Sequence, residues 1–92
     1  MQLILYSKPG CHLCEGLLEK LEQVKTIAFQ LEVRDITTRP DWFETYQYEI
    51  PVLCQNLAGA EKPLPRLSPR ASVRQLEQLL ERCLRSQPFS PE

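Results

Sequence analysis

Hydrophobic and polar positions recur along this chain with two different periods, and these periods divide it into strands and helices. Three consecutive apolar residues, Leu3 to Leu5, predict a short buried strand over residues 2–6. Pro9 and Gly10 end that strand. From about residue 12 to 25 the apolar positions recur every three or four residues, which predicts an amphipathic helix. Its apolar stripe consists of Cys14, Leu17, Leu18, Leu21 and Val24.

A strict alternation of apolar and polar residues follows over residues 28–34, where Phe29, Leu31 and Val33 are the apolar members. This period of two predicts a strand with one polar face, near the edge of a sheet. A strand, a helix and a second strand make a β-α-β unit, whose crossover is expected to be right-handed.

The second half of the chain predicts two helices and a hairpin. Pro40 suits the start of a short helix over residues 41–48, since its missing N–H costs nothing there. Pro51 opens a third strand, residues 56–61 connect the hairpin, and residues 62–67 form a short edge strand that contains two prolines. Ser72 and Gln75 match a capping box that starts the last helix. The expected apolar side chains are Trp42, Phe43 and Tyr46 in the short helix, and Val73, Leu76, Leu79, Leu80, Cys83 and Leu84 in the last one.

The predicted order is therefore β-α-β-α-β-β-α, an α/β architecture. A parallel strand pair followed by an antiparallel hairpin gives a four-stranded mixed sheet, and helices must cover both of its faces. We expect one domain over residues 1–85 and a flexible tail over residues 86–92, where two prolines occur.

Composition and charge argue against several classes of function. The 92 residues carry 11 basic and 12 acidic side chains, a net charge of -1, which gives no electrostatic case for nucleic-acid binding. No segment approaches the roughly 20 apolar residues of a membrane span. The N-terminus lacks the features of a signal peptide, so we expect the cytoplasm, where structural disulfides are rare.

Four cysteines are the residues most suggestive of chemistry. Cys11 and Cys14 form a C-x-x-C pair between the first strand and the first helix, an arrangement that favours dithiol redox chemistry. Unpaired N–H groups at the helix start favour a thiolate at Cys11, whereas Cys14 lies on the apolar stripe. We therefore expect an exposed Cys11 with a lowered pKa and a shielded Cys14. Cys54 and Cys83 stand alone and are expected to pack as small apolar residues, so zinc and iron-sulfur sites are minor alternatives.

Three segments carry a family resemblance: Leu5 to Cys14 (LYSKPGCHLC), Asp35-Ile36, and Tyr48 to Leu53 (YEIPVL). Together they resemble the glutaredoxins, and most closely the short bacterial glutaredoxin-like proteins of the thioredoxin superfamily. The resemblance covers about residues 2–85 and implies a thioredoxin-like fold. It also implies a cis peptide bond between Ile50 and Pro51, with the proline lying against the cysteine pair.

Two departures from the family pattern bear on function. Residues 67–72 (LSPRAS) stand where glutathione-binding glutaredoxins usually carry Gly-Gly and Asp, which puts the usual capture of glutathione in question. His12 and Leu13 replace a common Pro-Tyr pair. We expect this change to alter the reduction potential and the thiolate acidity while leaving redox chemistry in place.

The resemblance implies a small thiol–disulfide oxidoreductase in which Cys11 attacks a substrate disulfide and Cys14 resolves the mixed disulfide. Expected substrates are disulfide-containing proteins or glutathione-linked molecules, with glutathione or a thioredoxin-reductase-type donor as reductant. We expect a monomer with no bound cofactor and no metal. Competing interpretations are a redox-inactive binding or adaptor module and a dimer bridged by metal at Cys11. The residues expected to contact substrate are Lys8, His12, Leu13, Ile50 and Pro51.

Overall fold

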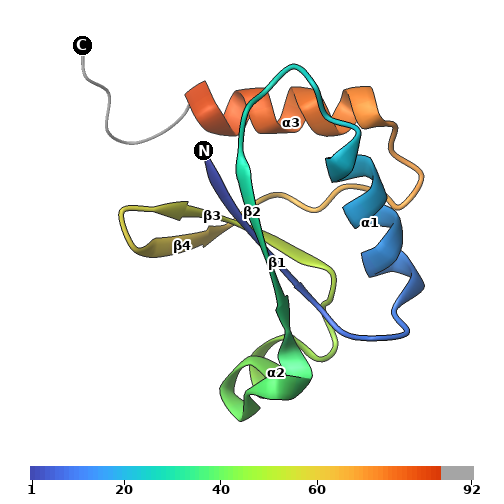
Figure 1. The fold of residues 1–92 in the computed structure, drawn as a ribbon, viewed down its shortest axis with the longest axis vertical. Coiled ribbons are helices and arrows are strands. Elements are labelled where there is room, and N and C mark those ends of the chain that lie inside the picture. Colours follow the sequence, from blue (N-terminus) through green and yellow to red (C-terminus); the bar gives the residue numbers. More distant parts are fainter. Residues whose placement is uncertain (86–92) are drawn as a thin grey trace.

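The computed structural model describes residues 1–85, and in them the predicted order of elements is confirmed (Figure 1). The predicted flexible tail, residues 86–92, lies outside the described residues. No helix in the described part is long and apolar enough to cross a membrane. The strands are β1 (Gln2–Ser7), β2 (Gln30–Asp35), β3 (Val52–Leu57) and β4 (Ala60–Pro63). The helices are α1 (His12–Glu22), the 3-10 turn η1 (Ile36–Thr38), α2 (Pro40–Tyr46) and α3 (Val73–Arg85).

The sheet has the order β2-β1-β3-β4, with β1 in the interior and β2 and β4 at the two edges. β1 pairs parallel with β2, and β3 runs antiparallel to both β1 and β4. The edge position predicted for the second strand is therefore confirmed. Because β1 is flanked by strands and covered on both faces, its residues 3–6 are all buried, which explains the uninterrupted apolar run.

The first face of the sheet is covered by α1 and α3, which lie next to each other in Figure 1. Leu3 and Leu5 of β1 point to this face and pack with Leu21 of α1 and Leu80 of α3. Since successive strand residues point to opposite faces, Ile4 and Tyr6 point the other way. The helices and this face together bury the larger of the two apolar clusters.

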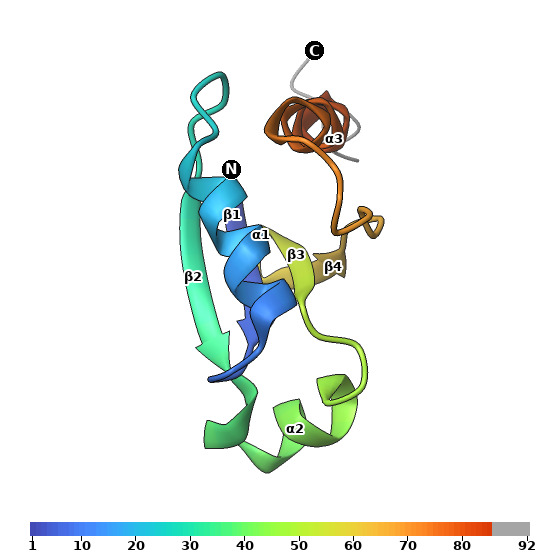
Figure 2. The same cartoon turned by 90° about the vertical axis from the view of Figure 1, so that its right-hand side faces the viewer.

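The second face is covered in a different way. The short helix α2 lies at the end of the sheet toward which β2 points (Figure 2). From α2, the Tyr46 ring stacks on Tyr6 with 4.2 Å between ring centroids, and Trp42 meets Tyr6 edge-on at 5.9 Å. Cys54 is fully buried in the same cluster. Aromatic contacts therefore close the α2 end of this face.

An ion-pair network spans the second face between the two edge strands. Arg34 of β2 donates through Nη1 to the Tyr6 hydroxyl at 2.8 Å and to a Glu61 carboxylate oxygen of β4 at 2.9 Å. The Tyr6 hydroxyl donates in turn to the other Glu61 oxygen. The Arg34 guanidinium also lies over the Trp42 ring, 5.1 Å from its centroid. A layer of paired charges therefore covers Tyr6 where no helix does.

Some predicted boundaries were wrong, for local reasons. The helix predicted to reach residue 25 ends at Glu22, because the N–H groups of Gln23 and Val24 bond to carbonyls three residues back and tighten the last turn. Val24 lies after the end of the helix but is still buried, because it packs in the core. Phe43 was expected on the apolar side of α2 but is 38% exposed, and Leu84 near the end of α3 is also exposed.

The hairpin connection is tighter than predicted. β3 continues to Leu57, the two-residue turn is Ala58-Gly59, and β4 begins at Ala60. Both turn residues have positive φ, 54° and 90°, the conformation that lets a two-residue turn follow the twist of its strands. β4 ends at Pro63 rather than continuing to residue 67, since Pro63 and Pro65 have no N–H for the ladder.

Candidate active site

The Cys11–Cys14 pair lies where β1 passes into α1. Cys11 is the N-cap of α1 with an extended backbone, and the two cysteines form a disulfide with their Cα atoms 5.3 Å apart. The Cys14 N–H points at the Cys11 sulfur, 3.2 Å away. Cys11 is half-buried whereas Cys14 is only 3% exposed. The structure thus places Cys11 at the helix start, half-buried where an exposed side chain was predicted, and the shielded Cys14 lies behind it as predicted.

The loop before Cys11 is shaped by Gly10. Its φ of +82° is a left-handed conformation that side chains rarely adopt. The turn is closed by a hydrogen bond from the Cys11 N–H to the Lys8 carbonyl at 3.3 Å. This turn brings the chain from the end of β1 directly to the N-cap, so Gly10 positions the cysteine pair.

The side chains nearest in sequence to the pair are exposed. Lys8 is exposed, and so is His12, whose ring nitrogen lies 3.7 Å from a Glu15 carboxylate oxygen. Leu13 is 53% exposed although its neighbour Cys14 is buried. The loop and the first turn of α1 therefore present one cation, an imidazole and an apolar side chain to solvent around Cys11.

The Ile50–Pro51 peptide bond is cis. The loop before it is held from two sides. The Ile50 N–H donates to the Tyr46 carbonyl of α2 at 3.1 Å, and Arg66 donates to the Glu49 carbonyl at 2.7 Å. The role of Arg66 in fixing this loop could not be predicted from local sequence, because Arg66 and Glu49 lie 17 positions apart.

A cavity of about 440 Å³ lies beside the start of α1. It contains three of the five residues expected to contact substrate, His12, Leu13 and Pro51, whereas Lys8 and Ile50 do not line it. Sequence reasoning missed Lys20, which faces this cavity and donates to the Pro69 carbonyl at 2.7 Å. The other lining residues are Gly16, Leu17, Glu49, Val52, Leu53, Pro63, Leu64, Pro65, Arg66, Leu67, Ser68, Pro69, Ala71, Leu76 and Leu79.

Comparison with known proteins agrees with the fold described above. The family model described as Glutaredoxin-like domain (DUF836) matches residues 2–81. The chain belongs to this glutaredoxin-like family. None of the curated proteins matches the chain.

Two solved structures resemble this glutaredoxin-like domain. One is the X-ray structure of the structural genomics target protein XcR50 from X. campestris, with 28% identity and a TM-score of 0.61, covering 87% of this chain and 96% of that one. The other is thioredoxin 1 from Thermosipho africanus TCF52B, with 18% identity and a TM-score of 0.63, covering 92% of this chain and 96% of that one. The second likeness concerns the fold alone, and it places this domain in the thioredoxin fold.

The other two cysteines of the glutaredoxin-like domain lie apart from the pair. Cys54 is fully buried in the second-face cluster, and burial raises its thiol pKa to about 11. Cys83 lies half-buried on α3 and packs against the first-face core. Both thus pack as small apolar residues, as expected. Within residues 1–85, no three His, Cys, Asp or Glu side chains gather closely enough to hold a metal.

Proposed function

We propose that this glutaredoxin-like protein is a thiol–disulfide oxidoreductase that reduces protein or glutathione mixed disulfides through Cys11 and Cys14. The observation that carries the proposal is the asymmetry of the pair: Cys11 is only half-buried at the N-cap of α1, and Cys14 is buried behind it. An attacking and a resolving thiol need these two environments, because only the first must reach the substrate.

The proposed reaction takes two exchanges. The Cys11 thiolate attacks one sulfur of the substrate disulfide, and the other substrate sulfur leaves as a thiolate that takes up a proton. The Cys14 thiolate then attacks the Cys11 sulfur of this mixed disulfide and expels the second substrate thiol. The substrate disulfide gains two electrons, and the protein is left with the Cys11–Cys14 disulfide.

The start of α1 supports the first step. A helix N-terminus stabilises an anion through its unpaired N–H groups and its dipole. The Cys14 N–H already points at the Cys11 sulfur, so the donor is in place before the thiolate forms. The cation of Lys8, three residues upstream, adds to the positive field over this end of the helix.

Substrate contact is assigned to Lys8, His12, Leu13, Ile50 and Pro51. Leu13 and Pro51 offer apolar surface in the cavity at the start of α1, and the backbone around Pro51 offers a segment for a peptide to lie against. We place the protein in the cytoplasm, with glutathione or a thioredoxin-reductase-type enzyme as the donor that reduces the disulfide again.

The test is a redox titration of the pair, read by the mass added when thiols are alkylated. A two-electron midpoint between about -270 and -200 mV would match thioredoxin- and glutaredoxin-type reductants. In a disulfide-reduction assay, Cys11→Ser is expected to abolish turnover and Cys14→Ser to accumulate the mixed disulfide. Cys83→Ser, outside the pair, is the matched control and should retain activity.

Two outcomes would contradict the proposal. The first is that no intramolecular disulfide forms at any potential. The second is that the Cys11→Ser, Cys14→Ser double variant retains the protein's normal function in cells. Either result would favour the alternative, a binding or adaptor module that keeps the fold without using the thiols.

A further inference from the structure

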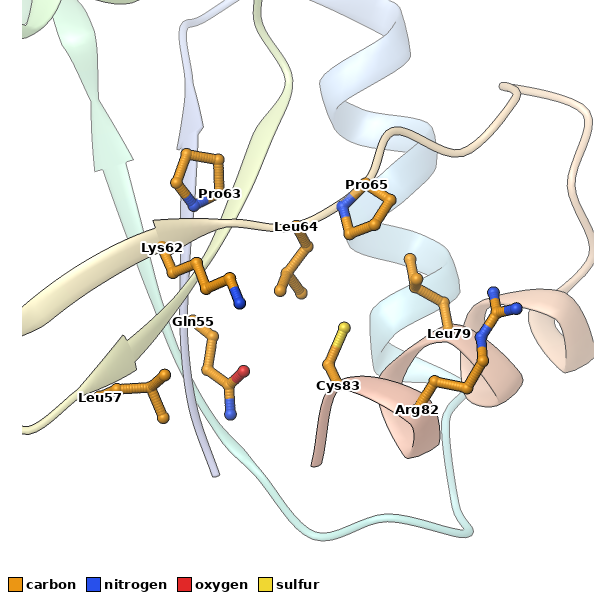
Figure 3. A pocket seen from close by; sticks show the side chains of 9 residues that line it. All are labelled: Gln55, Leu57, Lys62, Pro63, Leu64, Pro65, Leu79, Arg82 and Cys83. Carbon is orange, nitrogen blue, oxygen red and sulfur yellow. The ribbon is translucent and has the colours of Figure 1, made fainter. Parts of the chain in front are cut away.

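The loop between β4 and α3, residues 64–72, forms one wall of the cavity at the start of α1, since most of its residues line that cavity. Figure 3 shows where the loop leaves β4: Leu64 and Pro65 follow Pro63, and all three also line a separate cavity of about 580 Å³ between the hairpin and α3. The loop is therefore part of the candidate site as well as a connection between two elements.

Two cationic side chains tie this loop to its neighbours. Lys20 Nζ of α1 donates to the Pro69 carbonyl at 2.7 Å, and Arg66 Nη1 donates to the Glu49 carbonyl at 2.7 Å. All four residues line the cavity at the start of α1. Lys20 thus links the loop to the helix that begins at the cysteine pair, and Arg66 links it to the segment before β3. The loop bridges the two parts of the site.

The segment before β3 depends on Arg66 for one of its hydrogen bonds. The N–H groups of Glu49 and Ile50 both donate to the Tyr46 carbonyl, at 2.8 and 3.1 Å. Within residues 1–85, the donor to the Glu49 carbonyl is Arg66. A hydrogen bond from a charged donor is stronger than one between neutral groups. Arg66 therefore holds the peptide unit between Glu49 and Ile50 from the side of the cavity.

We propose that Arg66 is a positioning residue: it fixes residues 49–51 so that a peptide substrate can lie against them while Cys11 attacks the substrate sulfur. This role rests on the proposed oxidoreductase function. Arg66 makes and breaks no bond in either exchange, and its guanidinium keeps its protons. Its contribution is geometric, because a small displacement of bound reactants is costly in rate. A disulfide without a peptide backbone does not need the segment.

The test compares two substrates of the reduced protein in single-turnover kinetics. One is the disulfide-linked dimer of a pentapeptide with a central cysteine, and the other is hydroxyethyl disulfide, which has no peptide backbone. Arg66→Gln is expected to lower the rate constant for the peptide disulfide about tenfold, and that for hydroxyethyl disulfide less than about twofold. Unfolding or a less reactive Cys11 would slow both reactions, so a selective loss identifies positioning.

Two further variants act as controls. Arg66→Lys keeps a charged donor and should recover part of the rate lost with the peptide disulfide. Arg70→Gln removes the same charge from the same loop, at a residue outside the cavity lining, and should change both rate constants less than about twofold. In NMR spectra, Arg66→Gln should shift the Ile50 amide, which shares a peptide unit with the Glu49 carbonyl, and Arg70→Gln should not.

Three results would overturn the role of Arg66. They are equal rates of wild type and Arg66→Gln with the peptide disulfide, an equal loss with both substrates, and the same selective loss in Arg70→Gln. If reduced wild type reacts with neither substrate, the proposed function itself fails and the positioning role falls with it. The reaction of wild type with hydroxyethyl disulfide therefore separates the two failures.

Discussion

The two faces of the sheet are shielded from water by different kinds of side-chain contact. On the first face, Leu3 and Leu5 are covered by two amphipathic helices and the contacts are apolar. On the second face, Tyr6 is covered by a short helix at one end and by Arg34 and Glu61 for the rest. The first solution depends on area removed from water, and the second on hydrogen-bond geometry and charge. The faces should therefore respond to different perturbations.

The largest effect is expected on the first face. Leu80 of α3 is fully buried, so Leu80→Ala leaves a cavity and should lower the free energy of unfolding by about 2–5 kcal/mol. Val33→Ala on exposed β2 is the matched control and should cost less than about 1 kcal/mol. Urea unfolding of the oxidised protein measures both. Similar costs for the two variants would mean that α3 does not seal this face.

Thiol reactivity compares the two faces directly, since each has one cysteine outside the disulfide. The pKa of Cys54 is raised from 9.0 to about 11, so its thiolate at neutral pH is about a hundredfold scarcer than that of an ordinary thiol. In the oxidised protein, Cys83 should alkylate first and Cys54 only when urea unfolds the chain. Mass spectrometry of the labelled peptides distinguishes them. Equal labelling rates in the folded state would show that the second face opens readily.

Breaking the charge network should have a smaller effect. Arg34→Gln leaves Glu61 and the Tyr6 hydroxyl without their shared donor, and we expect a loss of about 1–3 kcal/mol of unfolding free energy. Arg85→Gln breaks the exposed pair with Glu81 on α3, away from this face, and should cost less than about 1 kcal/mol. If the two variants were equally stable in urea, the network would contribute no more than an ordinary surface ion pair.

The smallest expected effect is a pH dependence. Hydrogen bonds from Tyr6 and Arg34 hold the pKa of Glu61 below its usual value, so the folded chain binds this proton more weakly than the unfolded chain. The stability gained is present above the pKa of the unfolded carboxyl, about 4.3, and is lost as the pH falls through the folded pKa. Between pH 5 and 3, wild type should lose about 1 kcal/mol or less beyond the loss of Glu61→Gln, given the partial exposure of Glu61.

That experiment has its own internal reference. The pKa values of Asp35 and Asp41 are also lowered, by hydrogen bonds from Thr37 and Arg39, but both carboxylates remain in the Glu61→Gln variant. Their contribution therefore cancels in the comparison. Identical pH profiles for the two proteins would remove Glu61 from the acid sensitivity of the fold.

The first face could be predicted from sequence, and on the second face so could the packing of Trp42, Tyr46 and Cys54, but not the charge network, for a physical reason. Helical periodicity records which side of α1 and α3 is buried, so the burial predicted for Leu21 and Leu80 is confirmed. The Arg34–Glu61 pair joins residues 27 positions apart, and its two members look like ordinary surface charges in their own segments. Only the strand order brings them to one face. The prediction for Phe43 was wrong because apolar character alone does not say which side of a seven-residue helix meets the sheet.

The cysteine pair is easier to predict than its surroundings. The C-x-x-C spacing between a strand and a helix predicts Cys11 at the helix start and Cys14 on the buried side, and both predictions are confirmed. The cavity beside the pair is assembled from segments far apart in the chain, including Lys20 and Pro69, which are joined by a hydrogen bond across 49 positions. Local sequence patterns predict well which residues are buried, but they predict long-range polar contacts poorly.

The four-residue strand β4 also matters for how copies of the protein meet in concentrated solution. The unpaired backbone N–H and C=O groups of an open edge strand can form hydrogen bonds with another chain, which is how sheets grow into aggregates. β4 offers little of this: it is short, it carries Glu61 and Lys62, and it ends in Pro63, which has no N–H to give. The opposite edge, β2, carries Glu32 and Arg34. The charges and the proline that shape this fold thus also discourage the sheet from continuing into a neighbour.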